Sequence, residues 1–413
     1  MKHLSLARSL VMVGSAASLA GCYTNQGGNV SSSKMGDISN PATTGSPVDE
    51  LREACGGSDA MTAAGEAVIR RKPYLQRVTQ TSITVGWVSA ATDGEHVVVT
   101  TPNQLPAASV PGERESVIVR NSGESQKWAT IDNLQPGSIY CYAIVDGTTA
   151  LSERIGFRTA PAADSPAPVR FLAFGDSGGG GVDQRMLAEQ MYGYSYDLIV
   201  HTGDIAYDSG TIGEFEDTVF KMYSPLFRHV PFFPASGNHE YKTMQGAPFR
   251  AVFSLPGASG ERWYSYDWGR VHFAALDTEA DYQTQAKWLD ADLAATARPW
   301  KIVYFHKPPY SSGEHGSDTS LRKALEPIFQ KHHVQLVLAG HDHNYERMTP
   351  QKGVQHIVTG GGGVGTRPVG VSSFTAFSED VIHFVYVDVR TDEAIVHAVD
   401  ANGLEFDSVV VPR

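Results

Sequence analysis

Leu338-Ala339-Gly340-His341-Asp342-His343-Asn344-Tyr345 places two histidines one residue apart, directly after an apolar run. That run, from Val334 to Leu338, is typical of a buried strand. Because residues i and i+2 of an extended chain point to the same side, His341 and His343 can converge on one point. Imidazole pairs are good ligands for zinc, iron or copper, so the stretch predicts a metal site at the end of a strand.

The bulk properties are those of a globular protein with room for more than one domain. The chain has 413 residues and a formal net charge of −12. The negative charge argues against nucleic acid as a partner, because nucleic-acid-binding proteins usually carry basic patches. It does not argue against a small anionic substrate, since a bound metal ion makes its own positive site.

The first 22 residues are typical of an export signal. Lys2 and Arg8 form a basic start, and Leu10 to Ala20 is an apolar run too short to span a membrane. Leu19-Ala20-Gly21-Cys22 resembles the lipobox of bacterial lipoproteins, which implies cleavage before Cys22 and lipid attachment to its sulfur. We therefore expect an exported cell-envelope lipoprotein, in the outer membrane or facing the periplasm and anchored through Cys22, with plain secretion as the alternative.

Pattern divides the rest of the chain into three parts. Residues 23–67 are rich in Gly, Ser, Asn and Thr without a sustained apolar period, which predicts a flexible tether. Residues 68–160 contain short alternating strands between turns, which predicts a small β-sandwich, and Leu134 to Tyr140 resembles the tyrosine corner of fibronectin type III domains. From residue 168 to 413, strands alternate with helical stretches, which predicts a layered α/β domain.

Two cysteines remain beyond the signal, Cys55 and Cys141. An oxidising compartment favours their pairing. Sequence spacing cannot establish that two thiols touch, so the sequence leaves a disulfide open.

Five hydrophobic strands of the α/β region end in a short turn that carries an Asp, Asn or His. These residues are Asp176, Asp204, Asn238, His306 and His341. Ligand sites of open α/β sheets lie at the carboxyl ends of the strands, so we expect the five turns to meet. Taken singly, the aspartates are also explained as helix N-caps and Asn238 as a turn residue. Ligand-type side chains at all five strand ends favour one shared site.

The five turns resemble the five sequence blocks of the purple acid phosphatases. They read Gly-Asp-x-Gly (Asp176), Gly-Asp-x-x-Tyr (Asp204, Tyr207), Gly-Asn-His-Glu (Asn238), Val-x-x-His (His306) and Gly-His-x-His (His341, His343). The resemblance covers about Val169 to Val411, and Pro73-Tyr74-Leu75-Gln76 resembles the domain that precedes the catalytic one in larger members. It implies the metallophosphoesterase αββα fold, a two-sheet β-sandwich flanked by helices.

The resemblance also implies two metal ions. Asp176, Asp204, Tyr207 and His343 would hold the first. Asp204, Asn238, His306 and His341 would hold the second, with Asp204 bridging. A phenolate with carboxylates suits Fe(III), whereas two imidazoles and an amide oxygen suit a divalent ion such as Zn, Mn or Fe(II).

Three further residues follow from the resemblance. His239 is similar to the family histidine that contacts the phosphoryl oxygens, and Glu240 is expected to orient it. His315 lies where the family has a loop histidine that binds substrate or protonates the leaving group, with a solvated loop residue as the alternative. Plant members have neighbouring histidines where this chain has Glu314-His315, which leaves the substrate range open. We expect the run Gly360 to Gly363 to allow close backbone approach near the site.

The predicted function is that of a dinuclear phosphoric ester hydrolase. The resemblance implies an acid phosphatase that acts on small phosphomonoesters by attack of a metal-bound hydroxide. Two alternatives stay open: a phosphodiesterase or nucleotide hydrolase on the same site, and a non-catalytic binding lipoprotein with a vestigial site. A homodimer is also left open.

Overall fold

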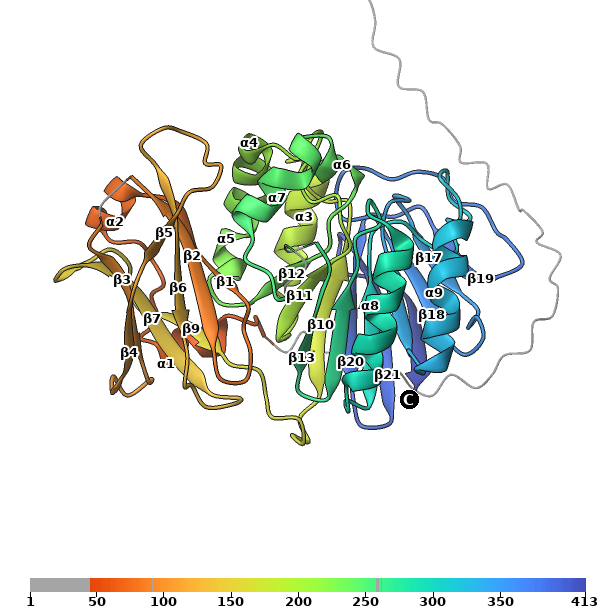
Figure 1. The fold of residues 1–413 in the computed structure, drawn as a ribbon, viewed down its shortest axis with the longest axis horizontal. Helices are drawn as coiled ribbons and strands as arrows, with labels where there is room; N and C mark the ends of the chain where they lie inside the picture. The colour runs from red at the N-terminus through yellow and green to blue at the C-terminus, as the bar shows by residue number, and fades with distance from the viewer. Residues whose placement is uncertain (1–44, 91–92, 258–259, 261) are drawn as a thin grey trace, which may run out of the picture. The chain divides into compact units, whose positions relative to one another are not determined.

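The computed structural model describes residues 45–90, 93–257, 260 and 262–413 (Figure 1). The predicted signal, the predicted lipidation site Cys22 and the first part of the predicted tether therefore lie outside the described residues. Among the described helices, none has both the length and the apolar character needed to cross a membrane.

The structure corrects the predicted tether, because its second half is folded. Helix α1 (Asp49–Ala54) packs against β9 (Ile155–Arg158), and its Leu51 is buried. Helix α2 (Ala63–Val68) begins after Thr62, whose hydroxyl accepts the N–H of Gly65 at 3.1 Å. Cys55 and Cys141 form a disulfide that links residues 86 positions apart. Few apolar residues suffice here, because the disulfide holds the segment against the β-domain.

The N-terminal β-domain consists of two facing sheets. One has the strand order β1-β2-β6-β5, and the other has the order β4-β3-β7-β8 with β9 paired to β7. The bounds are β1 (Ile69–Gln76), β2 (Ile83–Ser89), β3 (Glu95–Thr100), β4 (Pro106–Pro111), β5 (Glu113–Glu115), β6 (Ser125–Ile131), β7 (Ile139–Asp146) and β8 (Thr149–Ala150). The hydroxyl of Tyr140 accepts the N–H of Gln135 at 3.0 Å, the contact that defines a tyrosine corner.

The C-terminal domain is built on two larger sheets, which confirms the predicted fold class. The first has the order β12-β11-β10-β20-β21-β22. Its strands are β10 (Val169–Phe174), β11 (Leu198–His201), β12 (Phe232–Pro234), β20 (His383–Val389), β21 (Glu393–Asp400) and β22 (Glu405–Pro412). The second has the order β13-β14-β15-β16-β18-β17-β19. Its strands are β13 (Tyr264–Trp268), β14 (Val271–Ala275), β15 (Trp300–Tyr304), β16 (Leu336–Ala339), β17 (Tyr345–Met348), β18 (Gln355–Thr359) and β19 (Thr375–Glu379).

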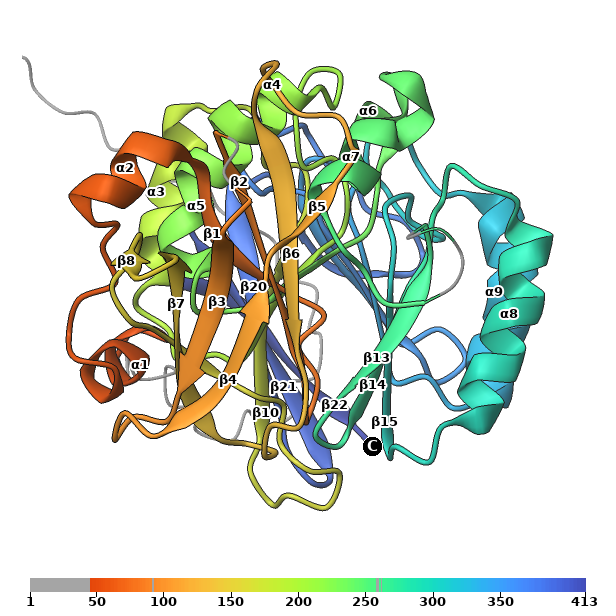
Figure 2. The same cartoon turned by 60° about the vertical axis from the view of Figure 1, so that its left-hand side comes forward.

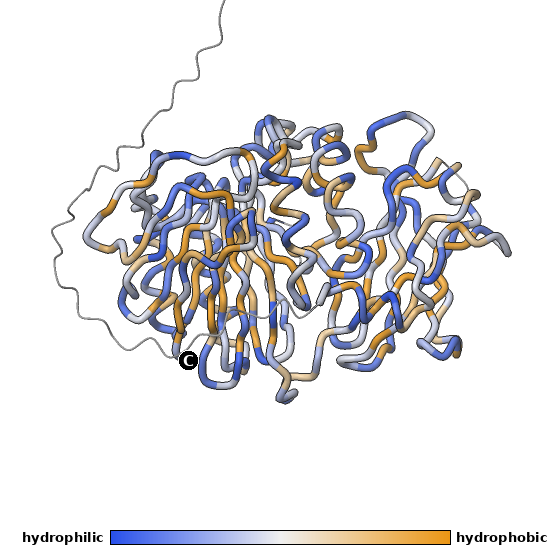
Figure 3. Tube along the Cα trace, turned by 180° about the vertical axis from the view of Figure 1, so that it is seen from behind, coloured by the Kyte–Doolittle hydropathy of each residue, from blue (hydrophilic) through white to orange (hydrophobic). Residues whose placement is uncertain are grey.

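Strand alternation explains how the layers stack. In β15, Ile302 and Tyr304 face the core between the two sheets, whereas Val303 faces the helices. Phe171 of β10 meets Phe273 of β14 edge to face at 5.3 Å across that core. Helices α8 (Tyr282–Ala295) and α9 (Thr319–Lys331) lie side by side on the outer face of the second sheet (Figures 1 and 2). The hydrophobic segments accordingly concentrate along the strands (Figure 3).

Shorter helices follow the first three strands of the first sheet, β10, β11 and β12. They are α3 (Val182–Met191), α4 (Ile212–Glu214), the π-helix Phe215–Phe220, α5 (Lys221–Phe227), α6 (Asn238–Tyr241), the 3-10 turn Met244–Gly246 and α7 (Ala247–Val252). Strands β10, β11 and β12 run parallel to one another, as do β14, β15, β16 and β18. The carboxyl ends within each set therefore lie at one edge of their sheet, which is where the predicted ligands occur.

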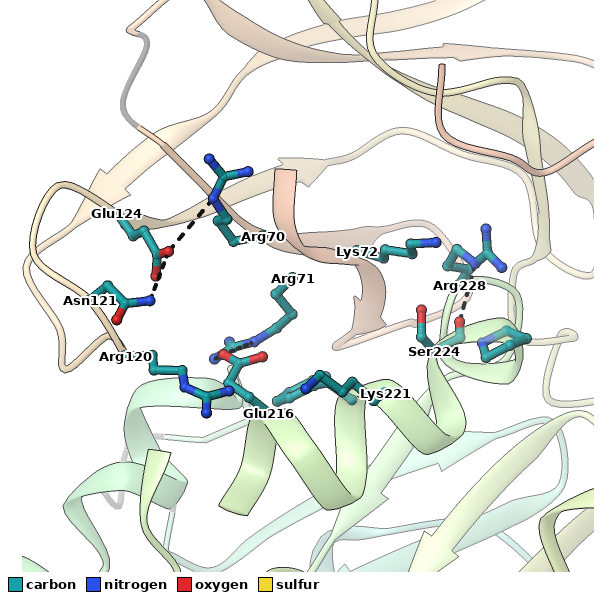
Figure 4. A pocket seen from close by; sticks show the side chains of 12 residues that line it. Arg70, Arg71, Lys72, Arg120, Asn121, Glu124, Glu216, Lys221, Ser224 and Arg228 are labelled. Atoms are coloured by element: carbon teal, nitrogen blue, oxygen red, sulfur yellow. Dashed lines mark hydrogen bonds and ion pairs between the residues drawn. The ribbon is translucent and has the colours of Figure 1, made fainter. Parts of the chain in front are cut away.

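A buried arginine joins the β-domain to the C-terminal domain. Arg71 of β1 donates from Nε and Nη2 to Glu216 of the π-helix at 3.0 and 2.5 Å (Figure 4). It also donates from Nη1 to Gln126 at 2.7 Å. Tyr74 donates its hydroxyl to the carbonyl of Val252 at 2.7 Å. These contacts tie β1 to the other domain.

A cavity of about 450 Å³ opens beside this arginine, and its lining is rich in cations (Figure 4). Each cation is paired with a carboxylate: Arg70 with Glu124, Arg71 with Glu216, Lys72 with Glu66, Arg120 and Lys221 with Asp217, and Arg228 with Asp59. Because the chain itself neutralises these charges, the cavity belongs to the structural seam between the domains.

Candidate metal centre

The predicted metal ligands occupy the ends of the parallel strands. Asp176 follows β10, Asp204 follows β11, His306 follows β15 and His341 follows β16. Asn238 begins α6, a few residues after β12. The side chains of Asp176, Asp204 and His306 are almost fully buried. The expectation that the strand-end turns meet is therefore realised by strands of both sheets.

The first predicted ligand set converges on the phenol oxygen of Tyr207. Its Oη lies 2.9 Å from Oδ1 of Asp176, 3.1 Å from Oδ2 of Asp204 and 3.2 Å from Nε2 of His343. Four ligand atoms from three segments, those after β10, β11 and β16, thus surround one small volume.

The second predicted set converges on Nε2 of His306. This nitrogen lies 3.1 Å from Oδ2 of Asp204, 3.2 Å from Oδ1 of Asn238 and 3.1 Å from Nδ1 of His341. Asp204, His306 and His341 have ligand atoms that all lie within 4.8 Å of one another, a spacing that suits a metal ion. Oδ2 of Asp204 belongs to both sets, which is the position of a bridging ligand.

Hydrogen bonding shows that the second set fits a cation. Nδ1 of His306 lies 3.0 Å from the carbonyl oxygen of Thr202, which can only accept, so Nδ1 carries the proton of the neutral ring. The lone pair on Nε2 then faces Asp204 and Asn238, whose oxygens are also electron-rich. Lone pairs that point at one another need a positive charge between them.

The electrostatics of the side chains alone lead to the same conclusion. Burial lowers the pKa of His306, but the carboxylates of Asp204 and Asp176 outweigh it and raise the pKa to about 10. Burial, with Asp176 and Asp204 nearby, raises the pKa of Tyr207 far above its usual value. Without a metal ion, protons bound to the cluster supply the positive charge that balances its carboxylates. A metal ion would replace those protons and allow the Tyr207 phenolate to form.

Three of the ligands have left-handed backbone conformations. The φ angles are 59° at Asp176, 52° at Asp204 and 71° at His341. Such angles are uncommon outside glycine, and they cluster at functional sites where the surroundings hold them. Gly340 must be glycine, because a Cβ there would lie 2.5 Å from Oδ2 of Asp176. The backbone at Gly340 therefore approaches the carboxylate of Asp176 closely.

Glu240 lies beside the centre, but its contacts differ from the expected ones. Its buried carboxylate accepts four backbone N–H groups, those of Gly237 (2.8 Å), Asp204 (3.0 Å), Ile205 (2.8 Å) and Ala206 (3.1 Å). It therefore holds the turn that carries Asp204, and the expectation that it orients the ring of His239 is wrong. The adjacent sequence positions suggested a contact that the helical turn of α6 does not make.

His239 lies next to the first ligand set, against the ring of Tyr207. Its ring lies on that of Tyr207 with 4.1 Å between centroids, and Nδ1 lies 2.6 Å from the carbonyl oxygen of Asp208. Nε2 is 3.8 Å from Oδ2 of Asp204, too far for a direct hydrogen bond. This nitrogen is available to a third group placed above the ligands.

His315 is also part of the site. Its ring stacks on that of His341 with 4.1 Å between centroids, and its backbone N–H donates to Oδ1 of Asp342 at 2.8 Å. Its side chain is exposed, so it is a solvent-facing loop residue that also contacts a predicted metal ligand. Asp342, fully buried, also accepts the hydroxyl of Ser311, so it holds the loop that carries His315. Asp342 was not among the predicted site residues, although it lies between His341 and His343 in the sequence.

Arg367 is a second residue beside the site that was not predicted from the sequence. Its Nη1 donates to Nε2 of His315 at 2.5 Å, and its backbone N–H donates to the carbonyl of His343 at 2.9 Å. The feature of the sequence that could have pointed to Arg367 is the glycine run Gly360 to Gly363 shortly before it. As expected, this run approaches the site, since the N–H of Gly362 donates to the carbonyl of Gly175 at 2.9 Å.

The comparisons with known proteins agree with this geometry. The model of the calcineurin-like phosphoesterases matches residues 169–345, which defines the class of the C-terminal domain. The model of the purple acid phosphatase N-terminal domain matches residues 71–159. Both matches, together with the similarity to acid phosphatases, agree with the resemblance of the sequence motifs to the purple acid phosphatases.

Individual relatives show how far the similarity extends. The chain is 30% identical over 283 residues to human acid phosphatase type 7, which covers 57% of this chain and 63% of the relative. It is 28% identical to the probable inactive purple acid phosphatase 1 of Arabidopsis thaliana, over 57% of this chain and 49% of the relative. The purple acid phosphatase of yellow lupin (Lupinus luteus) has the same fold, with a TM-score of 0.74 at 20% identity over 83% of this chain and 74% of that one. The match to the human relative thus spans less than two thirds of its length.

Proposed function

We propose that this protein is a phosphoric ester hydrolase that uses two metal ions and acts on small phosphomonoesters. The observation that carries the proposal is the pair of ligand sets joined at Oδ2 of Asp204. Two metal ions held side by side in this way can act on the attacking and leaving oxygens of a phosphoryl group. The name of the human relative, an acid phosphatase, supports the monoester preference.

Each ligand set suits a different ion. Asp176, Asp204, Tyr207 and His343 would hold Fe(III), because carboxylates and a phenolate are hard ligands. Asp204, Asn238, His306 and His341 would hold Zn, Mn or Fe(II). When bound, the two ions would supply Lewis acidity toward water and toward the phosphoryl oxygens.

The neighbouring side chains would position the substrate. Nε2 of His239 has room for a phosphoryl oxygen, because its direct neighbour Asp204 is 3.8 Å away. His315 would lie on the side of His341, where the leaving group departs. Because the guanidinium of Arg367 can only donate, Nε2 of His315 accepts and the remaining ring proton is on Nδ1. Nδ1–H of His315 is thus the group able to donate to a leaving-group oxygen.

Phosphodiester hydrolysis is the second candidate, because the same ligands serve both reactions in principle. A non-catalytic binding protein is the third, and relatives named as probably inactive give it some support. Retention of all seven predicted ligands in one cluster favours catalysis over both a vestigial site and a purely structural cluster. We further propose, from the lipobox alone, that the enzyme works in the cell envelope on a lipid anchor at Cys22.

The test combines metal content, visible spectrum and turnover. We expect two metal ions per chain, one of them iron, and a violet tyrosinate-to-iron band that Tyr207→Phe abolishes. Tyr282→Phe, which removes the hydroxyl of a half-buried tyrosine on α8, is the matched control and should keep the band.

Turnover separates the three candidates. The metal-loaded protein should hydrolyse phenyl phosphate faster than bis(4-nitrophenyl) phosphate. A faster diester rate would favour the phosphodiesterase. Absence of stoichiometric metal, with no hydrolysis of either ester, would favour the binding protein and overturn the proposal.

A further inference from the structure

Arg367 is held at the edge of the metal centre by its own backbone. Its N–H donates to the carbonyl of His343, a predicted metal ligand, at 2.9 Å. The side chain then crosses to another loop and meets Nε2 of His315 at 2.5 Å. Because the His315 ring stacks on His341, this contact places the guanidinium at the edge of a ring that lies against the second ligand set. Under the proposed function, in which the leaving group departs past His315, the guanidinium lies beside its path.

The guanidinium of Arg367 can bind a further anion. Its only acidic partner among the described residues is Glu314, with 3.6 Å between Nε and Oε2. The two side chains are 32% and 66% exposed. Ion pairs of this length and exposure contribute little, so an incoming anion can displace Glu314. Within the described part of the chain, Nη2 of Arg367 has no hydrogen-bond partner.

We propose that Arg367 selects substrates whose leaving group carries a second anionic group, a phosphate or a carboxylate. This inference rests on the proposed function and names the substrate class for the same site. A guanidinium offers parallel N–H groups that match the oxygens of either anion. The hydrogen bond to His315 fixes the orientation of the guanidinium before the substrate binds, which reduces the conformational entropy lost on binding.

The carboxylate of Glu314 acts against the selection that Arg367 makes. In the free protein it sits near the guanidinium, and a substrate anion takes its place. Its charge therefore opposes anionic leaving groups, whereas that of Arg367 attracts them. The two residues make opposite predictions for the same pair of substrates.

The experiment compares matched esters that differ only in the leaving-group charge. Phenyl phosphate is compared with 4-carboxyphenyl phosphate, and fructose 6-phosphate with fructose 1,6-bisphosphate. For Arg367→Gln, we expect kcat/KM to fall by about tenfold or more for the charged member of each pair relative to the neutral one, mainly through KM. For Glu314→Gln, we expect the ratio to move the opposite way by a few fold. A selective loss for only one pair identifies which anion is read.

A control and a binding measurement make the outcome decisive. Lys352→Gln removes an equal charge from an exposed side chain paired with Glu326, and should leave both ratios unchanged. Calorimetric titration of the metal-loaded protein with phenylphosphonate and 4-carboxyphenylphosphonate gives the same ratio without turnover. An equal loss for neutral and charged ligands, or no loss, would overturn the inference. If the wild-type protein hydrolyses no ester, the proposed function fails, and the phosphonate ratio still tests Arg367.

Discussion

Oδ2 of Asp204 lies 3.1 Å from Nε2 of His306, and the opposite ring nitrogen of His306 is tied to a backbone carbonyl. The same carboxylate oxygen lies 3.1 Å from the phenol of Tyr207. One oxygen atom thus joins two groups of ligands, each of which draws on strands of both sheets. Both groups depend on this atom, whereas His341 belongs to only one of them.

This asymmetry predicts how metal is lost. Asp204→Asn should lower the affinity for both ions, because the amide removes the charge that both share. His341→Ala should release the divalent ion and keep the iron, since His341 contacts only the second set. Metal analysis after gel filtration checks this: about zero ions per chain for the first variant and about one for the second. Equal stoichiometries in the two variants would contradict the bridging role of Asp204.

The pH dependence of stability should depend on His272. This histidine of β14 lies between Asp267 of β13 and Asp292 of α8, 2.8 Å from each. Burial lowers its pKa, but the hydrogen bonds to the two carboxylates outweigh it and raise the pKa to about 9. The folded state thus binds the proton more tightly than the unfolded state, whose pKa is about 6.5. The stabilisation is complete below pH 6.5 and is lost as the pH rises through about 9.

The size of this effect is about 3 kcal/mol in the free energy of unfolding. Urea unfolding of the metal-free protein at pH 6 and pH 9.5 measures it. His272→Gln should be less stable at pH 6 and should show a flatter profile. His96→Gln, in the β-domain, should keep the wild-type profile. If the His272→Gln variant kept the wild-type pH dependence of stability, protonation of His272 would not be its cause.

The seam between the domains should be sensitive to a single unpaired charge. Arg71 is 1% exposed and Glu216 is 14% exposed in their ion pair. Arg71→Leu leaves the carboxylate of Glu216 without its partner and should destabilise the protein by about 3–5 kcal/mol. The double variant Arg71→Leu/Glu216→Leu should recover much of that loss, because no charge is left unpaired. If the double variant is as unstable as the single one, packing of Arg71 on Phe220 is the larger contribution.

The disulfide should stabilise the β-domain from its N-terminal end. Replacing both Cys55 and Cys141 by serine removes a covalent link across 86 positions and should cost about 2–5 kcal/mol of unfolding free energy. A reducing agent should destabilise the wild-type protein by a similar amount and leave the serine variant unchanged. A wild-type protein insensitive to reductant, with the bond shown by mass spectrometry to be broken, would contradict this stabilising role.

The sequence by itself determined where the predicted metal ligands occur along the chain. His341 and His343 follow a buried strand, and the period of two in extended chain puts both on one side. The other ligands also follow short apolar strands, and parallel strands in one sheet bring their carboxyl ends to one edge. Local pattern and sheet geometry predicted an α/β domain with one shared site at the strand ends, whereas the two ligand sets and the αββα fold were implied by the family resemblance.

Only the tertiary structure decided which distant segments support that site. Glu240 caps the turn of Asp204 instead of orienting His239, and Arg367 reaches His315 across 52 positions. The disulfide and the folded segment from residue 45 onward likewise depend on contacts with β7 and β9. Side-chain contacts between loops depend on where each strand places its ends in space, and no periodicity in the sequence encodes that placement. The ligands could therefore be predicted from local pattern, whereas the residues that position them and read the substrate could not.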